Sequence, residues 1–156
     1  MSNLLEKTTV LKEYVEYVYD NLGRTLEGLT VEEARWKPMP ESNDVAYILR
    51  HMAKISKHLL PSVMGGDTVT AWKSDYEKID HGIAEMFGDL WEGRDKVLEE
   101  FNGLTDTDLD AVISLWGGKK PRKFGLFLLL SELVHHGGQV AYFRGTMRRL
   151  KEKKQL

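Results

Sequence analysis

The chain has 156 residues, of which 42% are hydrophobic and 29% are charged, and it contains no cysteine. This length suits one domain, residues 1–156, built around a single hydrophobic core, and the apolar fraction excludes a disordered chain. Without cysteine there is no disulfide and no thiolate site, so any metal ion must be bound by His, Asp or Glu. The net charge of −2 argues against a general nucleic-acid binder, which usually has an excess of Lys and Arg.

No segment resembles a membrane span or a secretion signal. The longest apolar run extends from Phe124 to Leu130 and is interrupted by Gly125, far short of the roughly 20 residues that a spanning helix needs. The N-terminus mixes Glu6 and Lys7 with leucines and lacks the apolar stretch of a signal peptide. We therefore expect a cytoplasmic protein without membrane association.

The first helix is expected between about Leu4 and Leu29. Apolar residues recur there at three- and four-residue steps, which is the spacing of one helical face. Thr30 and Glu33 then have the spacing of a capping box, which predicts a short helical turn that ends near Trp36.

A second helix is expected to start after Ser42 or Asn43, because both residue types are good N-caps. It should run to about Leu60 or Val63, where the Gly65-Gly66 pair closes it. The following residues, 67–76, are expected to form a loop.

A third helix is expected over Gly82–Asn102. The connection that follows, Thr105–Lys123, contains a stretch with strand propensity at residues 112–116 and then the turn signal Gly117-Gly118. A fourth helix should cover Phe124–Glu152, apolar early and basic late, as suits the helix dipole. Four long amphipathic helices predict an all-α four-helix bundle with long inter-helix connections.

Two ligand types lie one turn apart on the fourth helix. At 100° per residue, His136 falls inside the apolar stripe, Glu132 lies at its edge one turn earlier, and His135 is rotated about 100° away. A Glu-x-x-x-His pair is a common way to build half of a metal site. It also occurs as a simple hydrogen bond between the two side chains, and the spacing alone does not separate these alternatives.

The second helix adds two histidines on the same side. His51 lies at the edge of the apolar stripe and His58 lies two turns later, nearer the rim. Burying His51, Glu132 and His136 without a metal would leave polar groups in need of partners. A divalent cation would satisfy all three and would keep open positions for water or substrate.

Three segments in the right order are similar to those of one known family. His136–Gly145 resembles the His-Arg-Gly-Gln signature of the DinB/YfiT-like superfamily on its fourth helix. Asp44–Met52 resembles the second-helix segment of that family, and Leu29–Pro38 resembles its link between helices one and two. The resemblance spans nearly the whole chain.

This resemblance implies a bundle, often dimeric, with a divalent metal ion near its end. The ligands of the family are one His on helix two and a His-x-x-x-His pair on helix four, which carried over gives His51, Glu132 and His136 as the metal ligands. Glu132 departs from the family pattern, and Gly137 stands where the usual Arg follows the last His. Zinc, nickel or manganese remains compatible with this ligand set.

Characterised relatives are metal-dependent transferases and isomerases that use low-molecular-weight thiols. The resemblance thus implies a homodimeric, metal-dependent enzyme of transferase or hydrolase type that acts on a small molecule and not on nucleic acid. We expect His135, His58, Gln139 and Tyr47 to support the ligands, and no catalytic residue is assigned. The alternative is a metal-free helical bundle that acts as a dimeric binding or stress-related protein. A nucleic-acid adaptor that uses the basic C-terminus is a third reading, disfavoured by the net charge.

Overall fold

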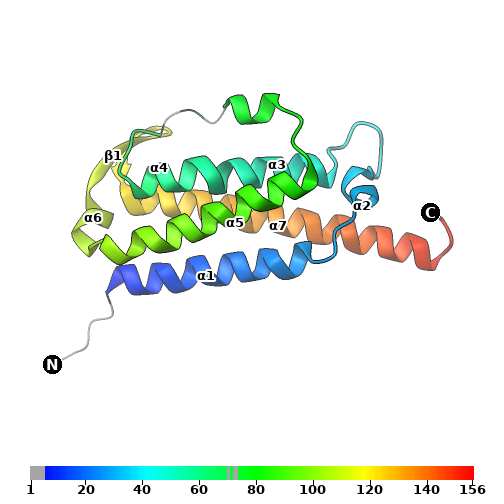
Figure 1. Ribbon diagram of the computed structural model, residues 1–156, viewed down its shortest axis with the longest axis horizontal. Coiled ribbons are helices and arrows are strands. Elements are labelled where there is room, and N and C mark those ends of the chain that lie inside the picture. Colours follow the sequence, from blue (N-terminus) through cyan, green and yellow to red (C-terminus); the bar gives the residue numbers. More distant parts are fainter. Residues whose placement is uncertain (1–5, 70, 72–73) are drawn as a thin grey trace.

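The computed structural model describes residues 6–69, 71 and 74–156 (Figure 1). The elements in chain order are α1 (Lys7–Leu26), α2 (Val31–Arg35), α3 (Val45–Lys54), the π-helix η1 (Ile55–Leu59), α4 (Leu60–Met64), the 3₁₀-helix η2 (Asp75–Lys78), α5 (Ile83–Glu100), the 3₁₀-helix η3 (Phe101–Gly103), α6 (Asp106–Asp110), β1 (Val112–Leu115), β2 (Gly118–Pro121) and α7 (Arg122–Glu152). Because α3, η1 and α4 follow one another without a break, they form one long helix.

This long helix, α1, α5 and α7 pack side by side as a bundle, which confirms the expected all-α four-helix class. Around the bundle, α7 lies between α1 and α3, and α5 lies between α3 and α1. The expected strand is also present, because β1 pairs antiparallel with β2 through a turn in which Gly117 has a positive φ of 78°. This small hairpin lies at one end of the bundle, and α2 lies near the other (Figure 1).

Several helix ends differ from the expected ones. The N-cap of the second helix is Asp44 instead of Ser42 or Asn43, because its carboxylate accepts a hydrogen bond of 2.8 Å from the backbone N–H of Tyr47. The helix closes as expected before Gly66, whose φ is +78°. In the third connection, α6 was not expected, although Thr105 and Asp108 form a reciprocal capping box at its start.

The first helix ends at Leu26, three residues earlier than expected, and the predicted start at Leu4 lies outside the described residues. Thr30 caps α2 by accepting a hydrogen bond from the N–H of Glu33. The Glu33 carboxylate accepts a bond of 2.8 Å from Arg144 of α7, which also donates to the backbone carbonyl of Thr25. Arg144 therefore fastens the end of α1 and α2 to the last helix.

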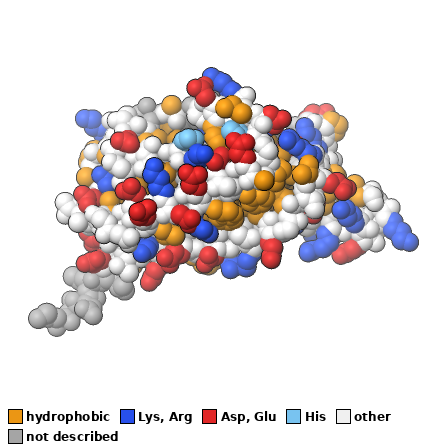
Figure 2. All heavy atoms as spheres, in the orientation of Figure 1, with side chains coloured by type: hydrophobic (Ala, Val, Ile, Leu, Met, Phe, Trp, Pro, Cys, Tyr) orange, Lys and Arg blue, Asp and Glu red, His pale blue; other side chains and the backbone are white. Residues whose placement is uncertain are grey.

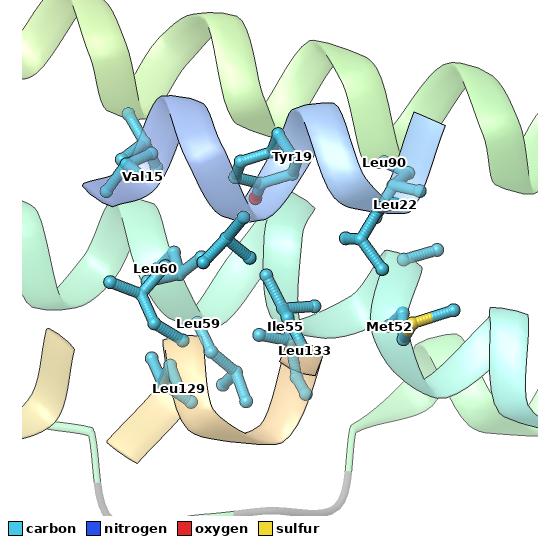
Figure 3. Close-up of a cluster of buried hydrophobic side chains, with 14 of the residues drawn as sticks. Val15, Tyr19, Leu22, Met52, Ile55, Leu59, Leu60, Leu90, Leu129 and Leu133 are labelled. Atoms are coloured by element: carbon cyan, nitrogen blue, oxygen red, sulfur yellow. The ribbon is translucent and has the colours of Figure 1, made fainter. Parts of the chain in front are cut away.

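The core is made mostly of leucines, valines and methionines from all four long helices (Figure 3). A buried polar link crosses it, in which the Tyr19 hydroxyl of α1 lies 2.6 Å from the hydroxyl of Ser56, and Ser56 donates to the carbonyl oxygen of Leu90 in α5. Gly93 of α5 passes so close to Ser56 that a Cβ atom would overlap the Ser56 carbonyl. Because Gly93 has no side chain, α5 can approach the π-helix η1, which is called the π-turn below.

The segment between α4 and α5 crosses over α3, and its short helix η2 is drawn in green above the bundle in Figure 1. Tyr76 of η2 is buried and stacks on His81, with ring centroids 3.9 Å apart. Its hydroxyl donates to Asp89 of α5, which also pairs with Lys57 at 2.5 Å. These contacts hold η2 against α5 and the middle of the second helix, near Lys57 in η1.

The visible face in Figure 2 has hydrophobic side chains in a depression between α5 and the second half of α1. This groove has a volume of about 650 Å³, and Phe87 and Trp91 contribute to its lining. Among the described residues, no helix is long and apolar enough to cross a membrane.

Candidate metal centre

The three expected ligands converge where α3 packs against α7. His51 lies on the last turn of α3, and Glu132 and His136 lie one turn apart on the facing side of α7. One donor atom from each side chain lies within 4.8 Å of the other two, and all three residues are partly buried. The rings of His51 and His136 meet edge to face, with centroids 4.7 Å apart.

The Glu132 carboxylate lies between the two rings. Its Oε2 atom is 3.3 Å from Nε2 of His136 and 3.7 Å from Nε2 of His51. Strong charge-assisted hydrogen bonds are shorter, about 2.7–2.9 Å. Two ligands that each stand about 2.1 Å from a tetrahedral metal ion are about 3.4 Å from one another. The observed separations of 3.3 and 3.7 Å are close to this value, so the three side chains fit one shared metal ion.

Gln139 determines which nitrogen of His136 faces the carboxylate. The side-chain oxygen Oε1 of Gln139 lies 2.7 Å from Nδ1 of His136, so Nδ1–H is the donor in this bond. In a neutral imidazole, Nε2 then carries a lone pair and points it at Glu132. Either a proton on Nε2 or a shared cation satisfies two lone-pair donors that face each other, and a hydrogen-bonded second nitrogen is usual for metal-binding histidines.

Sequence reasoning did not identify the groups behind His51. Oε1 of Glu77 in η2 is 3.6 Å from Nδ1 of His51 and 2.5 Å from the ammonium of Lys54, which is only 1% exposed. Burial and the nearby Lys54 charge lower the pKa of His51, which favours the neutral ring that a metal ion requires. Burial alone would raise the pKa of Glu77, but Lys54 and His51 hold it below its ordinary value.

The four residues expected to support the ligands have different positions. Gln139 contacts His136, and the His135 ring lies against the His136 ring with centroids 5.0 Å apart, although His135 is not part of the converging group. His58 is exposed, and its ring lies against Tyr76 instead. Tyr47 is 53% exposed.

The π-turn explains the position of His58. The backbone N–H of Leu60 donates to the carbonyl of Ile55, five residues earlier, so the hydrogen-bonded turn in η1 spans one residue more than in an α-helix. Residues after the start of this turn are rotated relative to a regular α-helix. His58 therefore leaves the face on which the α-helical period placed it together with His51.

A second group of candidate ligands, His81, Glu85 and Asp89, lies on the other side of η2. Its donor atoms are already used within the protein. The two nitrogens of His81 lie 2.8 Å from Glu85 and 3.0 Å from the carbonyl oxygen of Tyr76. The two oxygens of Asp89 accept hydrogen bonds from Lys57 and Tyr76. This group is a polar clamp that holds η2 against α5. The Lys57 ammonium supplies the positive charge that a metal ion would otherwise supply.

The comparisons with known structures show the fold. A DinB-like protein from Bacillus cereus superposes with a TM-score of 0.72 at 17% sequence identity, over 88% of this chain and 90% of that chain. A conserved protein from Enterococcus faecalis gives 0.69 at 18% identity, over 90% and 96% of the two chains. No curated protein matches the chain.

The family comparison covers the bundle and the candidate centre. The model of the DinB superfamily matches residues 14–140, a range that includes the three converging residues His51, Glu132 and His136 as well as Glu77 and Gln139. Because this match extends over most of the chain, the protein belongs to the DinB superfamily.

Proposed function

We propose that the protein is a divalent-metal-dependent enzyme of transferase or hydrolase type that acts on a small molecule, with a low-molecular-weight thiol as candidate co-substrate. The observation that carries this proposal is the placement of the Glu132 carboxylate at 3.3 and 3.7 Å from two imidazole nitrogens of different helices. Membership of the DinB superfamily, which is associated with metal ions, supports it.

Different residues of the chain would have different roles in such a centre. His51, Glu132 and His136 would hold the ion, which supplies a Lewis acid that lowers the pKa of a bound water or thiol and polarises a carbonyl. Gln139 orients the His136 ring through Nδ1–H, and Glu77 faces the corresponding nitrogen of His51. One carboxylate and two neutral rings favour zinc, nickel or manganese.

The centre is open to solution. The side chains of His51, Glu132 and His136 are 23%, 33% and 17% exposed. A structural metal site is usually closed by four protein ligands, whereas a catalytic site keeps a position for water or substrate. Three protein ligands at a partly exposed place therefore favour catalysis over a purely structural role.

The test is the metal content of the purified protein and of two variants after identical loading with zinc and desalting. The wild type should bind one equivalent, His136→Ala should bind none, and His135→Ala should bind nearly one, because His135 lies outside the converging group. At free metal of 100 times its Kd, the metal should stabilise the fold by about 2.7 kcal/mol, and a chelator should remove this gain. If all three proteins lack metal, the protein is a metal-free dimeric bundle.

We also propose that the protein is a homodimer. Large apolar side chains remain exposed on neighbouring faces of α1 and α7, among them Tyr14, Tyr17, Phe127 and Val134. These two helices pack against each other, so the side chains belong to one side of the bundle. Sedimentation should show a dimer at micromolar concentration that Phe127→Glu dissociates, and a wild-type monomer under these conditions would contradict the proposal.

A further inference from the structure

A pocket of about 570 Å³ lies on α7 directly beyond the candidate metal centre. Its apolar walls come from the aromatic rings of α7 and from the link between α2 and α3, namely Trp36, Pro38, Tyr142 and Phe143. Two polar groups, His135 and Gln139, line the side nearest the metal centre. Gln139 is also the residue that bonds His136, so one side chain belongs to both sites.

Gln139 and Phe143 form the side of the pocket that shares a helix face with the ligands, whereas His135, Gly138, Tyr142 and Thr146 are rotated further around α7. At 100° per residue, Glu132, His136, Gln139 and Phe143 lie within about 60° of one another around the axis of α7. At 1.5 Å per residue, Gln139 and Phe143 lie roughly 5 and 10 Å beyond His136 along that axis. A small molecule held at the metal centre can therefore extend along α7 into the pocket without leaving the surface of the helix.

The lining favours an apolar group of the size of an aromatic ring. Trp36 and Phe143 meet edge to face with ring centroids 6.3 Å apart, and they form a fixed aromatic wall. Tyr142 is 71% exposed in the chain alone, so its ring is available to cover a ligand. Pockets of this volume with apolar walls and a few polar groups are typical of small-molecule sites.

We propose that this pocket is the specificity subsite of the enzyme, and that it binds an aromatic or bulky apolar group of a substrate whose metal-binding group lies at His51, Glu132 and His136. The inference rests on the proposed metal-dependent function. It assigns a substrate class, in which a thiol or a carbonyl group is joined to an apolar body by a short spacer of two or three bonds.

The test uses protein loaded with Co²⁺, whose absorption spectrum reports both metal binding and coordination of a thiol sulfur. The probes are 2-phenylethanethiol and 2-mercaptoethanol, which share the thiol and the two-carbon spacer and differ in the phenyl group. We expect the phenyl compound to bind about 10- to 100-fold more tightly, because its ring leaves water on entering the pocket.

A variant that fills the pocket provides the control. A Cβ atom on Gly138, which lines the pocket, would meet no protein atom within 4 Å, so Gly138→Leu places a side chain there without a clash. It should bring the affinity for 2-phenylethanethiol down to that for 2-mercaptoethanol and leave the affinity for Co²⁺ unchanged. Gly88→Leu on α5, which also has open space around its Cβ position, should change neither.

The outcomes separate the two proposals. Co²⁺ binding with equal affinity for both thiols, or with an affinity for the phenyl compound that Gly138→Leu does not change, would overturn the subsite and leave the metal centre standing. A wild-type protein that binds no Co²⁺ would overturn the metal-dependent function and the subsite together.

Discussion

Nδ1 of His51 lies 3.6 Å from Oε1 of Glu77, a residue that belongs to none of the four long helices. The same oxygen lies 2.5 Å from the buried ammonium of Lys54, one turn after His51 on the second helix. The carboxylate of Glu77 thus stands between a buried cation and a candidate metal ligand. A carboxylate in this place favours the tautomer of His51 that carries its proton on Nδ1 and directs Nε2 toward Glu132.

Glu77→Gln should weaken metal binding by about 10- to 100-fold, the usual effect of removing a group that orients a ligand. A competition titration with a chromogenic chelator measures this change. Because the variant leaves the Lys54 ammonium buried beside a neutral amide, it should be compared with Glu77→Gln combined with Lys54→Met, which removes the buried charge. Asp75→Asn, an exposed change on the same short helix, should keep wild-type affinity. An unchanged affinity in both Glu77 variants would show that metal binding does not depend on Glu77.

Glu132→His should keep or raise the affinity for zinc and nickel and lower the affinity for manganese, because imidazole suits the first two metals and carboxylate suits manganese. The ratio of zinc to manganese affinity, measured by competition, should rise by about 10-fold or more. A large loss of zinc affinity would show that the backbones of α3 and α7 are spaced for a carboxylate.

Gly93→Ala should destabilise the fold by about 1–3 kcal/mol, because the new Cβ atom overlaps the backbone of Ser56 at the π-turn and forces α5 away. Gly88→Ala on the same helix meets no atom within 4 Å and should stabilise by about 0.5–1 kcal/mol through helix propensity. Urea unfolding of both variants gives the comparison. Equal stabilities would mean that the close approach of the two helices relaxes without cost.

Acid should loosen the clamp that holds η2. Burial would raise the pKa of Asp89, but its bonds to Lys57 and Tyr76 outweigh that effect and hold the pKa below its ordinary value of 3.8. As the pH falls, Asp89 takes up a proton at a higher pH in the unfolded chain than in the folded chain. The contribution of the clamp to the free energy of unfolding is therefore complete above about pH 4 and is lost as the pH falls through the folded pKa.

Asp89→Asn should therefore lower the free energy of unfolding by about 1–3 kcal/mol at pH 7, because hydrogen bonds to a charged carboxylate are lost. The difference in the free energy of unfolding between wild type and variant should decrease as the pH is lowered from 4 to 2. Urea unfolding across this range measures it, with Asp75→Asn as an exposed control whose difference should stay near zero. A difference that stays constant with pH would show that Asp89 does not titrate differently in the folded chain.

The sequence alone determined where the long helices lie and which residues share a face within each helix. The apolar period predicted the four long helices, and the same period placed Glu132 and His136 on one side of α7 with His135 turned away. These relationships depend on the rotation per residue, which is a local property of the backbone. For the same reason Thr30 and the two glycines after Val63 marked helix ends correctly, since caps act over three or four residues.

Packing between distant segments decided the rest. The π-turn that carries His58 away from His51 lies where Ser56 meets Gly93 of α5, and neither helix shows this contact in its own periodicity. The place of Glu77 behind His51 depends on how η2 crosses α3, because a loop has no repeating pattern from which to read a side-chain direction. The helical period therefore located the candidate metal ligands, whereas the groups around them were set by the fit of whole elements against one another.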